Sequence, residues 1–314
     1  MSDPVIDPAH AIPAASQLRR SRFRWRIVAF VALVAAVLAG TARFAGEAAL
    51  SRDTIARIVI DGTIATDPAR LRVFDTLAGD DTIKAVLIAI NSPGGTTAGG
   101  EELYEAIAGL RAKKPVVAYV NELGASAAYM AAIAADRIFV RRLSLVGSIG
   151  VLVQTTDASK LFQTIGVDLD KVASGPLKAE PEIDAPMTPE VRAALQALVD
   201  DSFSWFVDIV AERRGLSRAA VLPLADGRIL TGNQAIASGL VDAVGGEAEA
   251  IAWLEADRAV AADLPVLTWY PTDTPAWMNL GKWLGGTART ALGLPADTPL
   301  LLDGLVSLWQ VGAH

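Results

Sequence analysis

The fold class is decided by residues 83–135, which read IKAVLIAINSPGGTTAGGEELYEAIAGLRAKKPVVAYVNELGASAAYMAAIAA. Short runs rich in β-branched residues predict strands at Ile55–Ile60, Ile83–Ile90, Pro115–Val120 and Arg137–Val140. Between and after them, Thr97–Lys113 and Ala125–Ala135 have helical character. This alternation predicts an α/β fold whose mostly parallel sheet is covered by helices. Functional groups in such a fold lie where strands run into loops and helix N-termini.

Composition excludes several classes of function. The chain has 314 residues, 52% of them hydrophobic and 20% charged, which indicates one large folded domain or two modest ones. A net charge of -7 without a basic face argues against a nucleic-acid partner. There is no Cys, and the two His are His10 and His314, near the termini. Disulfides, zinc ribbons and cysteine-bound iron-sulfur clusters are therefore excluded, as are an HExxH zinc site, a 2-His-1-carboxylate iron site and a Ser-His-Asp triad in the core, so hydrolysis must use another base.

The N-terminal region predicts a membrane segment. An apolar run, Ile27–Ala42, follows five arginines at positions 19, 20, 22, 24 and 26. Arginines on one side of such a run keep the N-terminus in the cytoplasm and place the rest of the chain across the membrane. The run is shorter than the roughly 20 residues of a full span, and Gly40–Ala42 resembles a signal-peptide cleavage site. An uncleaved anchor and a cleaved signal peptide both remain open.

Two predicted strand ends carry unusual residues. After Ile90 comes Asn91–Gly95, predicted as a turn whose paired glycines can present bare backbone N–H groups near a helix N-terminus. An ordinary strand-to-helix connection is the alternative. After Val120 comes Ser126, crowded by small residues, which is the environment of a nucleophilic hydroxyl at a strand-to-helix turn. Here the alternative is a serine that caps the following helix.

A serine nucleophile in this chain needs a base other than His. Lys178 differs from the other lysines because it lies in the loop SGPLKA, residues 174–179, after the predicted sheet. Burial disfavours the charged ammonium, and a neutral lysine amine can take a proton from a hydroxyl near pH 7. The alternative is a solvated loop lysine.

Five motifs together resemble one family. They are NSPGG at 91–95, GASAAYMAAIAAD at 124–136, GSIGV at 147–151, SGPLK at 174–178 and ADGRILTGNQAIASGLVDAVGG at 225–246. In order and spacing this set resembles bacterial signal peptide peptidase A, a family of membrane-anchored serine proteases. The resemblance covers about residues 55–250 and implies the repeated β-β-α spiral of the Clp-protease/crotonase fold. It divides the chain into a cytoplasmic tail and transmembrane helix at 1–45, a peptidase domain at 46–258, and a Trp-rich tail at 259–314.

The same resemblance implies a role for individual residues. Ser126 matches the nucleophile, Lys178 the general base, and Ser148 the serine that hydrogen-bonds the lysine amine. The backbone N–H group of Gly95, with that of Ala127 or of Ser126 as its partner, would form the oxyanion hole. The small residues expected to border the bound peptide are Gly94, Gly124 and Ala125. Many members have two glycines after the nucleophile, where this chain has Ala127 and Ala128, whose methyl groups are expected to narrow the approach. The acid Glu102 is expected to be structural, near a helix N-terminus.

The implied function is a serine endopeptidase with a Ser-Lys dyad and no cofactor or metal. Its substrates would be released signal peptides or other membrane-associated apolar peptides. A ring-like or dome-like homo-oligomer at the bacterial inner membrane is implied, with a cytoplasmic N-terminus and a periplasmic catalytic domain. Two alternatives remain: a noncatalytic membrane scaffold that binds peptides, and a crotonase-type acyl-CoA enzyme.

Two apolar segments are candidate contact surfaces. A long helix, predicted at Pro189–Arg214, is either a packing surface for the oligomer or an ordinary core helix. The tail after Val260 contains Trp269, Trp277, Trp283 and Trp309, and tryptophan favours interfaces. The tail is therefore expected at the bilayer, at an oligomer interface or near the groove of a neighbouring copy, with docking onto its own domain as the alternative.

Overall fold

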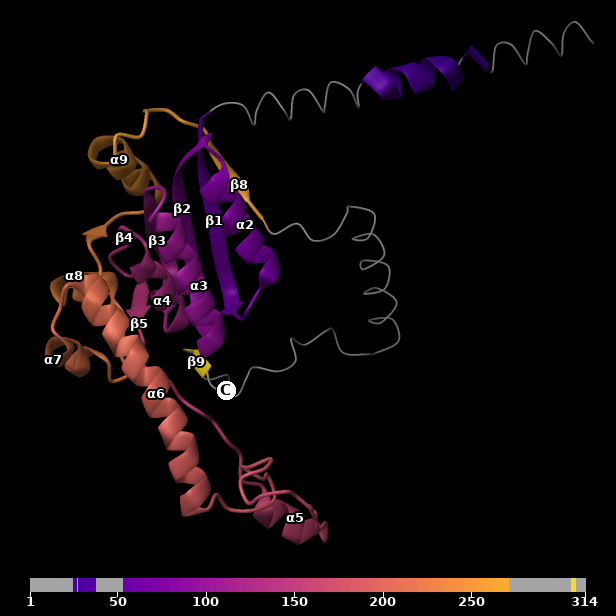
Figure 1. Ribbon diagram of the computed structural model, residues 1–314, viewed down its shortest axis with the longest axis vertical. Coiled ribbons are helices and arrows are strands. Elements are labelled where there is room, and N and C mark those ends of the chain that lie inside the picture. Colours follow the sequence, from indigo (N-terminus) through magenta and orange to yellow (C-terminus); the bar gives the residue numbers. More distant parts are fainter. Residues whose placement is uncertain (1–24, 27, 38–52, 271–305, 309–314) are drawn as a thin grey trace, which may run out of the picture. The chain divides into compact units, whose positions relative to one another are not determined.

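The computed structural model describes residues 25–26, 28–37, 53–270 and 306–308 (Figure 1). The chain separates into two units, Met1–Asp53 and Thr54–His314. In the first unit, residues 28–37 form a helix with exposed side chains. Within the described ranges, none of the helices combines the length and the apolar character needed to cross a membrane. The rest of the predicted apolar run, residues 27 and 38–42, lies outside the described residues.

The second unit is built on one sheet, to which nine strands belong in the part that the structure describes. They are β1 (Thr54–Ile64), β2 (Ile83–Thr96), β3 (Val116–Ala125), β4 (Arg137–Val140), β5 (Leu145–Gly147), β6 (Ile229–Thr231), β7 (Ala243–Val244), β8 (Val266–Trp269) and β9 (Val306–Leu308). The main order is β6-β5-β3-β2-β1-β8. Pairing is parallel except for β5 with β6 and β2 with β9. The predicted α/β class with a mostly parallel sheet is confirmed.

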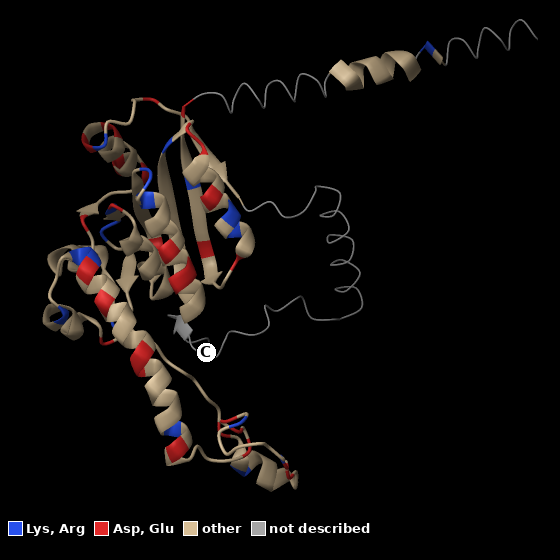
Figure 2. Cartoon of the chain, in the orientation of Figure 1, with Lys and Arg blue, Asp and Glu red and all other residues tan. Residues whose placement is uncertain are grey.

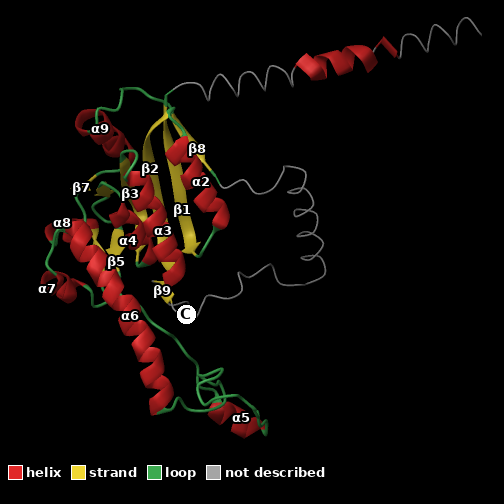
Figure 3. Ribbon diagram, viewed as in Figure 1, coloured by secondary structure: helices red, strands yellow, loops and turns green. Residues whose placement is uncertain are grey.

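Helices cover both faces of this sheet (Figure 3). They are α2 (Pro68–Gly79), α3 (Thr97–Arg111), α4 (Ala127–Ala134), α5 (Ser159–Ile165), α6 (Pro189–Arg214), α7 (Arg218–Val221), α8 (Gly232–Ala237) and α9 (Glu247–Asp257), with a 3-10 turn, η2, at Leu222–Leu224. Strand β2 shows why the sheet needs a layer of helices on each of its faces. Its alternate side chains Val86, Ile88 and Ile90 join the core under α2, α3 and α4, whereas Ala85, Leu87 and Ala89 join the core under α9. A strand buried on both faces has a continuous apolar sequence, as this one does.

Helix α4 is buried along its whole length. Its residues are mostly alanines, which allow close packing against α3 and the sheet. The hydroxyl of Tyr129 donates to the carbonyl of Leu240 at 2.7 Å, and burial raises the pKa of this phenol. At the other end, the Arg213 guanidinium donates to the carbonyls of Ile133 and Ala135, both at 2.8 Å. These contacts fix the helix that follows Ser126.

Residues 151–188 form an arm between β5 and α6. Figure 1 shows α5 and the N-terminal end of α6 extending away from the sheet. The arm exposes large apolar side chains: Leu152, Leu161, Ile165, Val167, Leu169, Val172, Leu177 and Ile183. Within it, the Lys171 ammonium pairs with Glu180 at 2.7 Å and with Glu182 at 2.6 Å. The arm is thus ordered by ion pairs while its apolar groups face solvent.

In both candidate contact segments, one part packs into the domain and another part does not. In α6, the C-terminal half contributes Phe206 and Val210 to the core, whereas Leu198 in the N-terminal half is exposed. In the predicted tail, β8 pairs in parallel with β1, and Trp269 packs against the core. The sheet therefore extends past residue 258. The other tail tryptophans, Trp277, Trp283 and Trp309, lie outside the described residues.

Candidate active site

The two unusual strand ends meet at one edge of the sheet. Strands β2 and β3 are parallel neighbours, and their pairing ends at Ser92 opposite Gly124. The segment that follows Ser92 and the turn at Ser126 are therefore adjacent. Ligands in open α/β sheets bind at the carboxyl ends of the strands, so this junction is the place where the sequence predicts chemistry.

Ser126 occupies a strained turn between β3 and α4. Its backbone has φ 58° and ψ -119°, a conformation that costs a non-glycine residue about 1–3 kcal/mol. The turn is held because the Ser126 N–H donates to the Gly147 carbonyl at 2.8 Å, while the Ser126 carbonyl accepts from the N–H groups of Tyr129 and Met130. The side chain makes no capping hydrogen bond to the first turn of α4. The alternative of a simple helix cap is therefore wrong, and the geometry is that of a nucleophile placed on a strand-to-helix turn.

Asn91–Gly95 is not the turn that the sequence predicts, because β2 continues through it to Thr96. A bulge in the pairing lets Gly94 and Gly95 lie opposite Thr63 and Ile64 of β1. Glycine is required at both positions. Gly94 has φ 104°, and a Cβ on Gly95 would lie 1.7 Å from the carbonyl oxygen of Ile64.

Ser92 holds this bulge and was not singled out by the sequence analysis. Its buried hydroxyl donates to the Gly62 carbonyl at 2.6 Å and accepts from the Gly94 N–H at 3.1 Å. One side chain thus ties β1 to the glycine segment of β2. The signal that could have found it is the serine inside NSPGG, since a short hydroxyl side chain next to Pro-Gly commonly bonds local backbone.

Ser148 lies beside Ser126. Strands β3 and β5 are parallel, with Ala125 opposite Gly147, so the two serines follow the last paired residues on neighbouring strands. Ser148 also has a positive φ, 50°, and its N–H donates to the Arg228 carbonyl at 2.7 Å. Ser126 is 1% exposed and Ser148 is 8% exposed. The structure therefore brings both predicted serines into one buried cluster.

Lys178 does not belong to this cluster in the described chain. It lies on the arm, in a turn where its N–H donates to the Gly175 carbonyl at 3.2 Å, and its side chain is exposed to solvent. A lysine base must be buried near the serine so that its amine loses the proton. In the single chain, Ser126 and Ser148 are buried, whereas Lys178 is exposed.

The remaining predicted residues are small and lie around Ser126. Gly124, Ala125 and Ala127 are all buried. A Cβ on Gly100 of α3 would lie 2.9 Å from the Cβ of Ala127, so the Ala127 methyl group faces α3. The expectation that this methyl narrows the substrate approach is therefore wrong. The methyl packs between two helices, and the backbone N–H stays at the start of α4.

Comparisons with known proteins identify the family of the chain. Residues 108–261 match the model of peptidase family S49. Over 205 residues the chain is 38% identical to a putative protease of Synechocystis, covering 65% of this chain and 74% of that protein. The chain belongs to peptidase family S49. The predicted family resemblance is confirmed, and with it the class of serine peptidase.

Other relatives of this S49 chain are similar over part of their length. A putative protease of Methanocaldococcus jannaschii is 40% identical over 185 residues, or 59% of this chain and 60% of that protein. A putative signal peptide peptidase SppA of Enterococcus faecium is 31% identical over 232 residues, or 74% of this chain and 65% of that protein. The chain thus spans about two thirds of the curated relatives that it matches.

Two solved structures are similar in fold. A mutant of ClpP1 from Listeria monocytogenes aligns at 18% identity with a TM-score of 0.42, covering 62% of this chain and 94% of that one. A mutant of the membrane-bound stomatin-specific protease 1510-N aligns at 17% identity with a TM-score of 0.45, covering 71% of this chain and all of that one.

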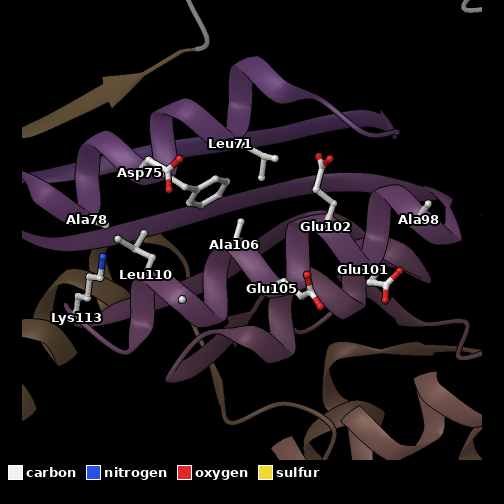
Figure 4. Close-up of a pocket in the computed structure, with 12 residues that line it drawn as sticks. Leu71, Asp75, Ala78, Ala98, Glu101, Glu102, Glu105, Ala106, Leu110 and Lys113 are labelled. Atoms are coloured by element: carbon white, nitrogen blue, oxygen red, sulfur yellow. The ribbon is translucent and has the colours of Figure 1, made fainter.

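A hollow of about 480 Å³ between α2 and α3 lies outside the serine cluster of this S49 domain (Figure 4). Its floor is apolar, with Leu71, Phe74 and Leu110, and its rim carries Asp75, Glu101, Glu102 and Glu105. Figure 2 marks the positions of acidic residues along α3 in red. Glu102 accepts from the N–H of Asp67 at 2.8 Å and pairs with Arg70 at 3.4 Å. Its role is structural, as expected, but it secures the start of α2.

A second polar cluster joins three strands of the sheet to α9. The Arg57 guanidinium donates to both carboxylate oxygens of Glu247, at 2.9 and 2.8 Å, and to the Thr268 hydroxyl. The Tyr119 hydroxyl donates to the same carboxylate. Burial raises the pKa of Glu247, but the hydrogen bonds from Tyr119 and Arg57 outweigh it, so the net pKa is lowered. Desolvation and this carboxylate raise the pKa of Tyr119. The cluster fixes β8 and α9 to the central strands.

Proposed function

We propose that this S49 peptidase is an endopeptidase in which Ser126 is the nucleophile and Lys178 the general base. The observation that carries the proposal is the Ser126 turn. A buried serine with positive φ, without a capping hydrogen bond, lies beside glycine backbone at the carboxyl edge of a parallel sheet. The Clp-protease/crotonase spiral is the fold type that we propose for the domain.

The chemistry is acyl transfer. A neutral Lys178 amine takes the proton of the Ser126 hydroxyl, and the oxygen attacks a peptide carbonyl. The N–H groups of Gly95 and Ala127 stabilise the oxyanion that forms, with each such donor contributing about 3 kcal/mol. The protonated lysine then gives its proton to the leaving amine, and water hydrolyses the acyl-enzyme by the same route. The Ser148 hydroxyl positions the lysine amine.

Lys178 reaches Ser126 when the arm is covered by other copies of the chain. The arm exposes eight large apolar side chains, one of them, Val172, completely. Many exposed apolar side chains on one segment favour an interaction site, because leaving them in water is unfavourable. Packing of arms in a ring-like or dome-like homo-oligomer would bury the arm and Lys178 together. The isolated chain would then have a nucleophile without its base.

The substrates are apolar peptides at a membrane surface, with released signal peptides as the substrate class. Support comes from the arginines before Ile27–Ala42, which favour a single-pass anchor with the catalytic domain on the periplasmic side of the inner membrane.

A fluorophosphonate probe tests the dyad. Oligomeric wild-type protein should be labelled on Ser126, as located by peptide mass spectrometry, and Lys178→Met should lose the label. Lys160→Met is the matched control, because Lys160 is also an exposed lysine of the arm. Wild-type labelling of Lys178→Met would overturn the role of Lys178, and a label on another residue would overturn that of Ser126.

Mixing two inactive variants tests whether the site forms between copies. Ser126→Ala and Lys178→Met should each be inactive on a fluorogenic apolar peptide. If Lys178 of one copy serves Ser126 of another, mixed oligomers should recover up to about a quarter of the sites, a figure that assumes random pairing and independent, additive sites. Mixed oligomers that stay inactive would place both residues of the dyad in the same copy.

A further inference from the structure

The α2–α3 hollow, the cavity of about 480 Å³ between these two helices, has an uneven charge. Four of the residues that line it carry carboxylates, namely Asp75, Glu101, Glu102 and Glu105, whereas Lys113 alone carries a positive charge. Figure 4 shows Lys113 at one end of the hollow and Glu101 and Glu102 toward the other. The rim is therefore acidic over most of its length, above an apolar floor.

Most of these carboxylates have no cation of their own. Glu102 pairs with Arg70 at 3.4 Å. In the part of the chain that the structure describes, Asp75, Glu101 and Glu105 form no ion pair. Glu101 and Glu105 are both exposed and lie one turn apart on α3, which places like charges side by side and disfavours the helix slightly. A cation supplied by another molecule would relieve this repulsion.

The α2–α3 hollow begins next to the proposed catalytic residues. Ala98 lines one end of it and lies three residues after Gly95, a proposed oxyanion donor. Ala98 and Leu110 both line the hollow and are twelve residues apart on α3, which is about 18 Å at about 1.5 Å per residue. An extended peptide covers that length with about five or six residues. A peptide that is cut at Ser126 therefore has room to place a short flanking segment in the hollow.

The chemistry of the hollow selects which flanking segment fits. Lysine and arginine side chains have apolar stems and charged ends, so they match an apolar floor with carboxylates on its rim. Peptides that lie at a membrane surface are commonly rich in these two residues. We propose that the α2–α3 hollow is an exosite, a binding site outside the catalytic residues, for a basic segment that flanks the apolar stretch of the substrate. This inference rests on the proposed peptidase function and narrows its substrate class.

Peptide binding measured without catalysis tests the exosite. Two fluorescent peptides share a stretch of ten apolar residues, and one begins with three lysines where the other has three glutamines. Glu101→Gln with Glu105→Gln removes two rim carboxylates. The matched control is Asp201→Asn with Asp257→Asn, which makes the same change in net charge at two exposed acids on α6 and α9. All variants are made in oligomeric full-length protein that carries Ser126→Ala, and fluorescence anisotropy reports the Kd.

The variant without Glu101 and Glu105 should bind the lysine peptide about fivefold more weakly than the parent, since one exposed ion pair strengthens binding by up to about fivefold. Its Kd for the glutamine peptide should not change, and the control should bind both peptides like the parent. Raising the salt concentration to about 1 M should remove the difference, because exposed charges are then screened. With Ser126 restored, the loss should appear in KM for the lysine peptide, with kcat unchanged.

Three results would overturn the exosite. The first is an equal Kd for the lysine peptide in all the proteins, even if wild-type protein cleaves both peptides as proposed. The second is an equal loss in the control, which would assign the effect to net charge. The third is loss of the oligomer in the variant without Glu101 and Glu105, measured by light scattering, which would assign the hollow to a contact between copies. Selective weakening together with an inactive wild-type enzyme would support the exosite and overturn the proposed function instead.

Discussion

Adding one methyl group at Gly95 is the sharpest test of how the site is built. In the Gly95→Ala variant, the new Cβ would lie 1.7 Å from the carbonyl oxygen of Ile64, 2.5 Å from its carbonyl carbon and 2.6 Å from its nitrogen. These are backbone atoms of the neighbouring strand, so no side chain can rotate away to make room. Since carbon and oxygen atoms in sheets approach to about 3.3 Å, β1 and β2 must separate locally by about 1.6 Å.

Separating the two strands should lower both the free energy of unfolding and kcat. Overpacking of a tight interior costs about 1–3 kcal/mol, and each backbone hydrogen bond lost adds about 1 kcal/mol, so we expect the free energy of unfolding to fall by about 3 kcal/mol. The domain should still fold, since typical domains have about 5–15 kcal/mol. The displacement also moves the N–H that we propose as an oxyanion donor, and loss of one such donor lowers kcat by about 10²–10³-fold.

Urea unfolding followed by tryptophan fluorescence measures the first effect, and hydrolysis of a fluorogenic apolar peptide measures the second. The matched control is Gly109→Ala, at an exposed position of α3 where a Cβ has no heavy atom within 4 Å. It should be as active as wild type and up to about 1 kcal/mol more stable, because alanine favours the helix. A Gly95→Ala protein with the wild-type unfolding midpoint would refute the close approach, and wild-type kcat would refute the oxyanion role.

Three further predictions concern other parts of the domain. Ser148→Ala should lower kcat at least about tenfold and shift the pH–rate profile with little change in KM, because the Lys178 amine loses the hydroxyl that positions it; an unchanged profile would assign Ser148 a structural role. Arg213→Met removes both guanidinium hydrogen bonds to carbonyls at the end of α4 and should lower the free energy of unfolding by about 2–3 kcal/mol; an unchanged urea midpoint would contradict this. Since the folded-state pKa of Glu247 is lowered, its ionised carboxylate stabilises the fold above the ordinary glutamate range, and this contribution is lost as pH falls through the lowered pKa. Thermal melts of wild type should therefore lose more stability between about pH 5 and pH 3 than those of Glu247→Gln, and parallel curves would exclude the effect.

Local signals in the sequence were sufficient for some elements. The predicted helix Pro189–Arg214 has the observed bounds of α6 because its ends are encoded nearby. Thr188 accepts from the N–H of Val191, Pro189 starts the first turn, and Gly215 ends the helix with a left-handed backbone. Likewise, a parallel sheet places successive strand ends at one edge, so the proximity of Ser126 to the glycine segment followed from the order of elements alone.

Other features depend on contacts that no local pattern records. Asn91–Gly95 has the composition of a turn, but pairing with Thr63 and Ile64 keeps it in the strand. Lys178 is exposed because it lies on an arm whose apolar side chains pack against nothing else in the single chain. The SGPLK motif carries no information about this packing. The pairing of Val306–Leu308 with β2 joins segments more than 200 residues apart, and the positive φ of Ser126 is imposed by Gly147 and α4.

If assembly supplies the base, as we propose, the exposed arm also means that proteolysis is postponed. A newly made copy has Ser126 in its strained turn while Lys178 is still in water. Such a copy would pass through synthesis and translocation without cutting the chains around it. Activity would then appear only above a threshold density of copies and would rise more steeply than in proportion to their number. On the proposed function, the number of copies that can assemble would set when digestion begins.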